Sequence, residues 1–274
     1  MPMTINTNLV SLNAQRNLTT SQSSLATSMQ RLSSGLRVNS AKDDAAGLAI
    51  AERMNAQVRG MNVAIRNAND AISLSQTAEG ALGKVGDMLQ RMRELAVQSA
   101  NATNGTSDRA NLNAEYQALG TEVVRTLANT KFNGLAILGA NAGTLSFQVG
   151  ANAGETVDVV TTRLDTAGSI TGATGGAITD ATLAGTAMTN IDTALTAVNG
   201  ERALYGATQN RFDAIIGTLQ VAAENQAAAK SRITDADFAA ETANLSRAQI
   251  LQQAGSAMVA QANQLPQAVL ALLR

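Results

Sequence analysis

The stretch AQILQQAGSAMVAQANQLPQAVLALL, residues 248–273, contains no charged side chain, and Arg274 follows it. A run of this length has the reach of a membrane-spanning helix. It carries seven Asn and Gln residues, however, and hydrocarbon penalises unpaired amides heavily. Its apolar stripe has heptad spacing and consists of Leu251, Ala254, Met258, Ala262, Leu265, Val269 and Leu272. The run therefore predicts a helix that other protein surrounds on several sides.

The N-terminal end of the chain has the same character. Arg16 is the only charged residue before Arg31. Apolar residues at helical spacing form a second stripe: Leu9, Leu12, Leu18, Leu25, Met29, Leu32 and Leu36. The two helices can pair through their stripes, either as a hairpin folded onto its own domain or as ends that neighbouring copies complete. We favour the second arrangement, because both helices lack the charges of a soluble surface helix.

Composition excludes several functional classes. Aromatic residues make up 2% of the chain, which suits closely packed helices better than a compact globule. Cys and His are both absent, so metal sites and nucleophile–base pairs built on them are impossible. A net charge of −1 without a basic run argues against nucleic acid and an anionic membrane surface as partners. The start MPMTINTNLV lacks a basic region and an apolar core, so we expect no cleaved secretory signal.

The first half of the chain predicts three helices. Gly35 can end the first helix, and Ser40 with Asp43 resembles a capping box for the second. Apolar residues then recur at helical spacing to about residue 101. A continuous helix of that length spans about 80 Å at roughly 1.5 Å per residue, which predicts a rod. A third helix over about 106–130 and a loop, KFNG, at 131–134 follow.

The second half predicts a β-hairpin, a loop and two helices. Apolar residues alternate on both sides of the turn signal GANAGE, which predicts a hairpin over 144–160. Residues 161–187, rich in Thr, Gly and Ala, are expected to be irregular and exposed. Helical spacing returns over about 191–230, and Thr234 or Asp235 can cap a final helix. The predicted fold class is therefore mainly α: a long antiparallel helical rod with a small β-hairpin, whose terminal helices pair as a coiled coil.

Four segments resemble bacterial flagellin. INTNLVSLNAQRNL at 5–18 and MQRLSSGLRVNSAKDDAAGLAIAERM at 29–54 are similar to the N-terminal signature of the family. Residues 231–274, which begin SRITDADF, are similar to its C-terminal signature. SFQVGANAGETV at 146–157 is similar to the hairpin of that family. Matched blocks at both ends, in the same order as in the family, make the resemblance specific.

The resemblance implies two domains. Residues 1–43 with 235–274 would form D0, the paired terminal helices that line the filament core, and 44–234 would form the rod domain D1. Many flagellins insert large outer domains in the middle of D1. Here only 161–187 is available, so the chain resembles a minimal form. We expect the Ser and Thr residues of that segment to be unmodified, although some flagellins carry sugars there.

The resemblance also implies partners and a location. The filament is a helical homopolymer outside the cell, so the first partner is a second copy of the chain. Export through the type III apparatus of the flagellum, an export chaperone on the C-terminal helix, and the filament cap and hook-junction proteins are implied as well. The absence of Cys agrees with export of an unfolded chain. No membrane span and no cofactor are expected.

Two sets of candidate site residues follow. The apolar stripes of the terminal helices are the candidate polymerisation residues: Leu9, Leu12, Leu25, Leu32, Leu251, Met258, Leu265, Val269 and Leu272. The segment LQRMRELAVQ at 89–98 resembles the part of flagellin that the vertebrate Toll-like receptor for flagellin recognises. Arg91, Leu95 and Glu115 match the main positions of that pattern. Leu89, Met92 and Ala96 of the same segment are expected to be core.

Three alternatives remain at the level of the sequence. A hook–filament junction protein would share the terminal helices but would match the terminal segments less fully. A secreted adhesin or receptor ligand would act as a monomer and would not regrow filaments after acid disassembly. An enzyme would need carboxylate or Lys chemistry. Acidic residues such as Asp44 and Glu52 lie at helix starts or on helical faces, and no phosphate-binding loop is present, so we expect no catalysis.

Overall fold

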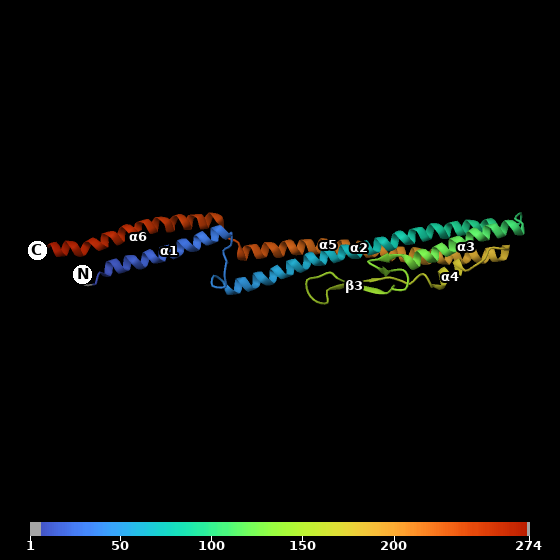
Figure 1. Cartoon of the computed structure of the whole chain (residues 1–274), viewed down its shortest axis with the longest axis horizontal. Helices are drawn as coiled ribbons and strands as arrows, with labels where there is room; N and C mark the ends of the chain where they lie inside the picture. The colour runs from blue at the N-terminus through green and yellow to red at the C-terminus, as the bar shows by residue number, and fades with distance from the viewer. Residues whose placement is uncertain (1–6, 273–274) are drawn as a thin grey trace. The chain divides into compact units, whose positions relative to one another are not determined.

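Figure 1 shows the computed structural model of the chain, which describes residues 7–272 and the side chains of residues 7–264. The fold is mainly helical, as predicted. The helices are α1 (Leu9–Ser34), α2 (Ala45–Ala100), α3 (Thr106–Asn129), α4 (Gly168–Thr174), α5 (Ala181–Thr234) and α6 (Phe238–Leu272). The strands form two antiparallel pairs: β1 (Lys131–Phe132) with β2 (Leu135–Ala136), and β3 (Thr144–Gln148) with β4 (Thr156–Val160).

The chain divides into two compact units. Residues 1–56 and 225–274 form the terminal unit, which contains α1 and α6. Residues 57–224 form the middle unit, which contains α3, α4 and all four strands. Helices α2 and α5 contribute residues to both units.

The core of the middle unit lies between α2 and α5. The predicted seam of α2 is confirmed, because Leu82, Val85, Leu89, Met92 and Ala96 are all fully buried. Helix α2 continues through Gly80 and Gly83. Two polar contacts fix the antiparallel register of α2 and α5. Arg93 Nε lies 2.7 Å from Asp192 Oδ1, and Gln209 Nε2 donates to Glu79 Oε2 at 2.9 Å.

The predicted hairpin over 144–160 is confirmed. Thr144 pairs with Val160 and Gln148 pairs with Thr156, so β3 and β4 are joined by the GANAGE turn. Val157 and Val159 are buried on one face of β4, as the alternation predicts. The hairpin packs on the helices through Phe147, whose ring meets that of Phe212 edge to face at 6.0 Å between centroids.

The predicted loop at 131–134 is wrong in one respect. Strands β1 and β2 form a very short hairpin there, with Phe132 paired to Leu135. Asn133 and Gly134 turn the chain at φ values of 48° and 83°. Both lie in the left-handed region that a two-residue hairpin of type I′ requires, and Asn-Gly is its preferred sequence. The Asn-Gly pair was the signal that the sequence interpretation overlooked.

The predicted irregular, exposed segment at 161–187 is also wrong. It contains α4 and the first turns of α5, and its apolar residues Ile170, Ala173 and Ile178 are fully buried. Side chains of α2 and α3 hold its backbone: Ser99 donates to the carbonyl of Ile178, Tyr116 to that of Ala173 and Gln117 to that of Gly176. Burial raises the pKa of Tyr116 to about 12, because the phenolate would lose its hydration. The hydrogen bonds from α2 and α3 therefore fix the backbone conformation of this segment, which its Gly-rich sequence alone does not determine.

The helix caps differ in part from the predicted ones. Gly35 ends α1 with φ 71°, as predicted. Asp44 caps α2, because its Oδ1 accepts from the Gly47 amide at 2.8 Å, whereas Asp43 closes the preceding turn on Ser40. Helix α6 is capped by Asp237 and not by the predicted Thr234 or Asp235; its Oδ1 accepts from the amides of residues 239 and 240 at 2.9 and 3.2 Å.

A short bridge joins the connection between α1 and α2 to the connection between α5 and α6. Leu36 pairs with Asp235 in an antiparallel bridge. The Arg37 amide donates to the Thr234 carbonyl at 2.7 Å, and the Ala236 amide donates to the Gly35 carbonyl at 2.9 Å. We call these contacts the joint of the terminal unit.

Candidate functional site

Helices α1 and α6 lie side by side in the terminal unit (Figure 1) and run antiparallel. Asn8 at the start of α1 donates to the carbonyl of Ala262, whereas Arg31 near its end lies 3.8 Å from Glu241. Buried and half-buried residues recur along both helices at alternating steps of three and four. In α1 they are Ser11, Ala14, Leu18, Ser21, Leu25, Ser28 and Leu32; in α6 they are Glu241, Leu245, Ala248, Gln252, Gly255, Val259 and Ala262. This is a heptad seam.

The seam is built mostly from small and polar residues. A Cβ on Gly255 would lie 3.2 Å from Leu18 Cδ1, so the backbones approach closely at this point. The hydroxyl of Ser11, which is buried, hydrogen-bonds Asn263 Oδ1 at 2.7 Å. Short side chains therefore let α1 and α6 pair without using most of their large apolar residues.

This arrangement corrects the predicted pairing of the two apolar stripes. Leu9 is 68% exposed and Met258 is 61% exposed, and Leu12 and Leu251 are exposed as well. Leu25 and Leu32 lie half-buried in the seam. Leu265, Val269 and Leu272 lie outside the residues whose side chains are described. The other large apolar residues exposed on these two helices are Val10, Met29, Phe238 and Ile250.

The physical reason is the register of α6. Its seam passes through Gln252, Gly255 and Val259, one position after the predicted Leu251, Ala254 and Met258, and coincides with the predicted stripe again at the buried Ala262. The largest apolar residues of α6 therefore lie beside the seam, and a second heptad that includes small residues forms it. Burying a large apolar side chain fully is worth about 1.5–3 kcal/mol, and this driving force is left unused in the single chain.

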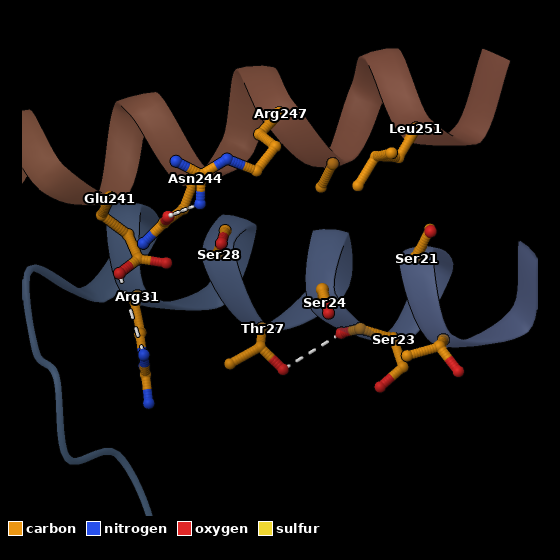
Figure 2. Close-up of a pocket in the computed structure, with 12 residues that line it drawn as sticks. Ser21, Ser23, Ser24, Thr27, Ser28, Arg31, Glu241, Asn244, Arg247 and Leu251 are labelled. Carbon is orange, nitrogen blue, oxygen red and sulfur yellow. Dashed lines mark hydrogen bonds and ion pairs between the residues drawn. The ribbon is translucent and has the colours of Figure 1, made fainter. Parts of the chain in front are cut away.

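A groove opens on one face of the α1·α6 pair, and Figure 2 shows its lining. Its volume is about 430 Å³. Helix α6 contributes Glu241, Asn244 and Arg247, and α1 contributes Arg31 near one end. The remaining α1 side chains in the lining all carry hydroxyls: Thr20, Ser21, Ser23, Ser24, Thr27 and Ser28. We call this the hydroxyl groove.

A second hollow of about 310 Å³ continues from the hydroxyl groove, and both are lined by Ser21 and Leu251. Its lining is more apolar and includes Val10, Ala14 and Met258. One face of the paired helices thus presents a polar depression followed by an apolar one.

The candidate receptor residues lie in the middle unit. Arg91 Nη1 lies 3.0 Å from Glu94 Oε2, and its Nη2 lies 2.9 Å from Glu115 Oε1. These hydrogen bonds, first to Glu94 and then to Glu115, raise the pKa of Arg91 above its usual value. The structure therefore brings Arg91 and Glu115 together on the surface, from α2 and α3. Leu95 is 1% exposed and packs in the core, so it adds nothing to that surface.

Other kinds of site are not found in the described part of the chain. Within residues 7–272, no group of three or more acidic side chains is placed to hold a metal ion. None of the helices, as far as they are described, is both long and apolar enough to cross a membrane.

Comparisons with known proteins identify the family of this chain. The sequence profile of the bacterial flagellin N-terminal helical region matches residues 5–142, and that of the C-terminal helical region matches residues 188–273. A flagellin of Halalkalibacterium halodurans is 50% identical over 272 residues, which cover 99% of this chain and 100% of that protein. Flagellin A of Vibrio cholerae is 36% identical over the whole of both chains. That alignment spans 379 positions, so the Vibrio protein has residues that this chain lacks.

A solved structure shows the same likeness. The crystal structure of Bacillus cereus flagellin matches with a TM-score of 0.51 and 34% identity, over 60% of this chain and 94% of that one. The two profiles together cover both terminal helices, which carry the seam and the exposed apolar side chains. The chain, at 274 residues a compact member of its family, belongs to the bacterial flagellins; it is a structural, non-enzymatic subunit of the extracellular filament that serves motility.

Proposed function

We propose that the outer faces of α1 and α6 are the surface through which copies of this flagellin polymerise. The observation that carries the proposal is the placement of the large apolar residues. Leu9, Leu12, Leu251 and Met258 are exposed although small residues fill the seam beneath them. These exposed side chains add no hydrophobic stabilisation to the monomer, because they stay in contact with water. Removing them from water between copies gives the assembly its driving force.

The absence of charge supports the same surface. Between Arg247 and Arg274 the chain has no charged residue, and before Arg31 it has only Arg16. If these faces carried Lys or Glu, identical copies packed closely around an axis would bring like charges together. Each buried ion without a partner would also lose its hydration, which is costly. Uncharged Ser, Thr, Asn and Gln residues avoid that cost and still offer hydrogen bonds.

The domain assignment remains part of this proposal. Residues 1–43 and 235–274 would line the filament core as D0, and 44–234 would form D1 around it. The compact terminal unit is somewhat larger, because it also holds the first turns of α2 and the last turns of α5. The joint supports the inclusion of these turns, since Thr234 at the end of α5 accepts the hydrogen bond of Arg37.

Truncation tests the polymerisation surface. A chain that lacks residues 248–274 is expected to stay soluble and to form no filaments, because most of the α6 face is gone. The measurement is electron microscopy after seeding with filament fragments. Thermal unfolding of the truncated chain is the control, since the core of the middle unit contains none of the deleted residues. Filaments of normal length from the truncated chain would rule the proposal out.

Further partners belong to the same proposal. The exposed apolar face of α6 would need cover before assembly, which supports an export chaperone that binds this helix. The cap and the hook-junction proteins would contact the surfaces that the first and last copies leave open. A complex of the chaperone with the full chain, lost when residues 248–274 are deleted, would support the first of these contacts; an unchanged complex would contradict it.

A second function is favoured by one observation, the ion-paired surface of Arg91 and Glu115. We propose recognition by the vertebrate Toll-like receptor for flagellin through this surface. Reversing the charge in Arg91→Glu is expected to weaken the response of reporter cells to the monomer. Arg125→Glu is the matched control, because Arg125 is also exposed and paired, with Glu122 on α3. Equal responses to both variants, or none to the unaltered monomer, would contradict the proposal.

A further inference from the structure

The hydroxyl groove contains one buried polar atom that has no partner in the described chain, Arg31 Nε, and two nearly buried polar residues beside it, Ser28 and Glu241. Ser28 is 5% exposed and lines the groove. Glu241 is 8% exposed, and its carboxylate has one ion pair, at 3.8 Å from Arg31, which is too long for a hydrogen bond. The Nε atom of Arg31 is buried and has no partner within the described chain.

Buried polar groups in folded proteins almost always have hydrogen-bond partners, because an unsatisfied group loses its hydration without compensation. The side chains of Ser28, Arg31 and Glu241 all line the same groove (Figure 2). Their needs differ, since a guanidinium only donates, a carboxylate only accepts, and a hydroxyl does both. A group that both donates and accepts therefore suits all three side chains.

Apart from the apolar Ala248 and Leu251, the rest of the lining has the same preference. The hydroxyls of Thr20, Ser21 and Thr27 donate to carbonyls of their own helix, at 3.0–3.1 Å, so their oxygens remain free to accept. Asn244 and Arg247 add donors from the other side of the groove. This lining matches a carboxamide, whose NH₂ donates and whose oxygen accepts.

We propose that in the filament the hydroxyl groove receives carboxamide side chains from the charge-free part of α6 of a second copy. This inference rests on the proposed polymerisation, and it specifies one contact between copies, the one at the hydroxyl groove. Gln249, Gln253 and Gln261 are exposed and lie on one row of α6 at steps of four and eight residues. Rows at steps of four form the ridges by which helices pack into grooves. The occupant of the groove is thus a ridge of amides on a neighbouring copy.

The absence of cysteine makes a direct test possible. Two single-cysteine chains are prepared, ¹⁵N-labelled Ser24→Cys and unlabelled Gln253→Cys, and mixed before assembly. Ser24 is exposed in the groove lining, and Gln253 lies in the middle of the amide row. Because the cysteines are on different chains, a mixed disulfide between labelled and unlabelled peptides can only form between copies. We expect it by mass spectrometry in filaments and not in the monomeric mixture.

Gln22→Cys is the matched control, since Gln22 is also exposed on α1 but is not part of the groove lining. Two residues before Ser24, it lies about 200° around the helix, on the side away from the groove. With this chain in place of Ser24→Cys, the mixed disulfide is expected to be several-fold weaker, because helix packing brings groove and ridge together and leaves other faces apart. Equal cross-linking of both positions, or none at Ser24, would overturn the groove contact. Filament growth in the same samples shows separately that polymerisation itself is intact.

Filling the groove gives a second measurement. Ser24→Phe is expected to raise the critical concentration for seeded growth by about tenfold, because the amides lose hydrogen bonds to charged groups. Gln22→Phe places the same ring outside the groove and is expected to raise it less. Helix content by circular dichroism checks that both monomers fold. If Ser24→Phe assembles like the unaltered chain, the groove holds water only and the proposal fails, whereas the polymerisation surface stands.

Discussion

The two units of this flagellin place their large apolar residues in opposite ways. In the middle unit Leu82, Leu89 and Phe212 are fully buried, and side chains such as Tyr116 bind the carbonyls of the Gly-rich segment. In the terminal unit small and polar residues make up most of the seam between α1 and α6, and Leu9, Val10 and Met258 remain exposed. The middle unit therefore has a complete core within one chain. The terminal unit has a pairing seam and an unused apolar exterior, which a polymer can use.

The largest expected effect is in the core of the middle unit. Leu89→Ala removes a fully buried side chain and leaves a cavity, which lowers the free energy of unfolding by about 2–5 kcal/mol. Chemical denaturation of the monomer, followed by circular dichroism, measures the change. Leu251→Ala is the counterpart in the terminal unit, where Leu251 is half-exposed, and it is expected to lower the free energy of unfolding by less than about 0.5 kcal/mol. Equal losses would remove the distinction between the units.

A second prediction concerns the close contact of α3 with α4. A Cβ on Gly120 would lie 2.9 Å from the carbonyl oxygen of Thr174, so Gly120→Val must push α4 away. Overpacking of this kind costs about 1–3 kcal/mol. Gly185→Val in α5 introduces the same residue where nothing lies within 4 Å of the new Cβ. The difference between their unfolding midpoints isolates the contact, and identical midpoints would show that α4 does not depend on it.

The terminal unit is expected to respond in assembly and not in folding. Met258→Ser removes a large exposed apolar side chain, so the stability of the monomer stays within about 0.5 kcal/mol. Loss of roughly 1–2 kcal/mol of burial between copies would raise the critical concentration about tenfold. Ala260→Ser, at an exposed position of the same helix, controls for the added hydroxyl. A destabilised monomer with normal assembly would reverse the interpretation of this face.

The difference between the units also explains what the sequence could predict. The α2 seam and the β3–β4 hairpin follow from the spacing of large apolar residues, and both are confirmed. Helix α4 could not be predicted in this way, because Ser99, Gln117 and other distant side chains hold its backbone and its exit. In α6 the predicted stripe differs by one residue from the seam at Gly255, where small size and not hydrophobicity decides the packing, whereas Leu25 and Leu32 of α1 lie in the seam as predicted.

The candidate polymerisation surface stays a prediction, and the structure changes where several of its residues lie within the helix pair. Residues expected to meet inside the pair, such as Leu251, lie outside it, and the hydroxyl groove carries no sequence pattern of its own. Its lining comes from two helices that are more than 200 residues apart in the chain. A single sequence shows the period along each helix and does not show the rotation of one helix against the other.

The smallest expected effect is a pH dependence of the joint. Hydrogen bonds from the amides of Asn39 and Ser40 lower the pKa of Asp43, and those from the hydroxyls of Ser231 and Thr234 lower the pKa of Asp235. A carboxyl whose pKa is lower in the folded chain stabilises the fold above its unfolded pKa, and this contribution is lost as the pH falls through the folded value. The joint is therefore expected to weaken only below about pH 4.

Amide hydrogen exchange in the monomer measures this effect. The protected amides are those of Arg37 and Ala236, which donate to the carbonyls of Thr234 and Gly35. Their protection factors, corrected for intrinsic exchange, are expected to fall below about pH 4 and to stay constant at higher pH, because the two carboxylates are then ionised. Asp235→Asn, which alters the carboxyl of the joint itself, should lower protection at neutral pH and flatten the acid response, since an amide keeps the acceptor oxygen but not the charge. Protection that fell equally in Leu89 and other core amides of the middle unit would indicate general acid unfolding and not a property of the joint.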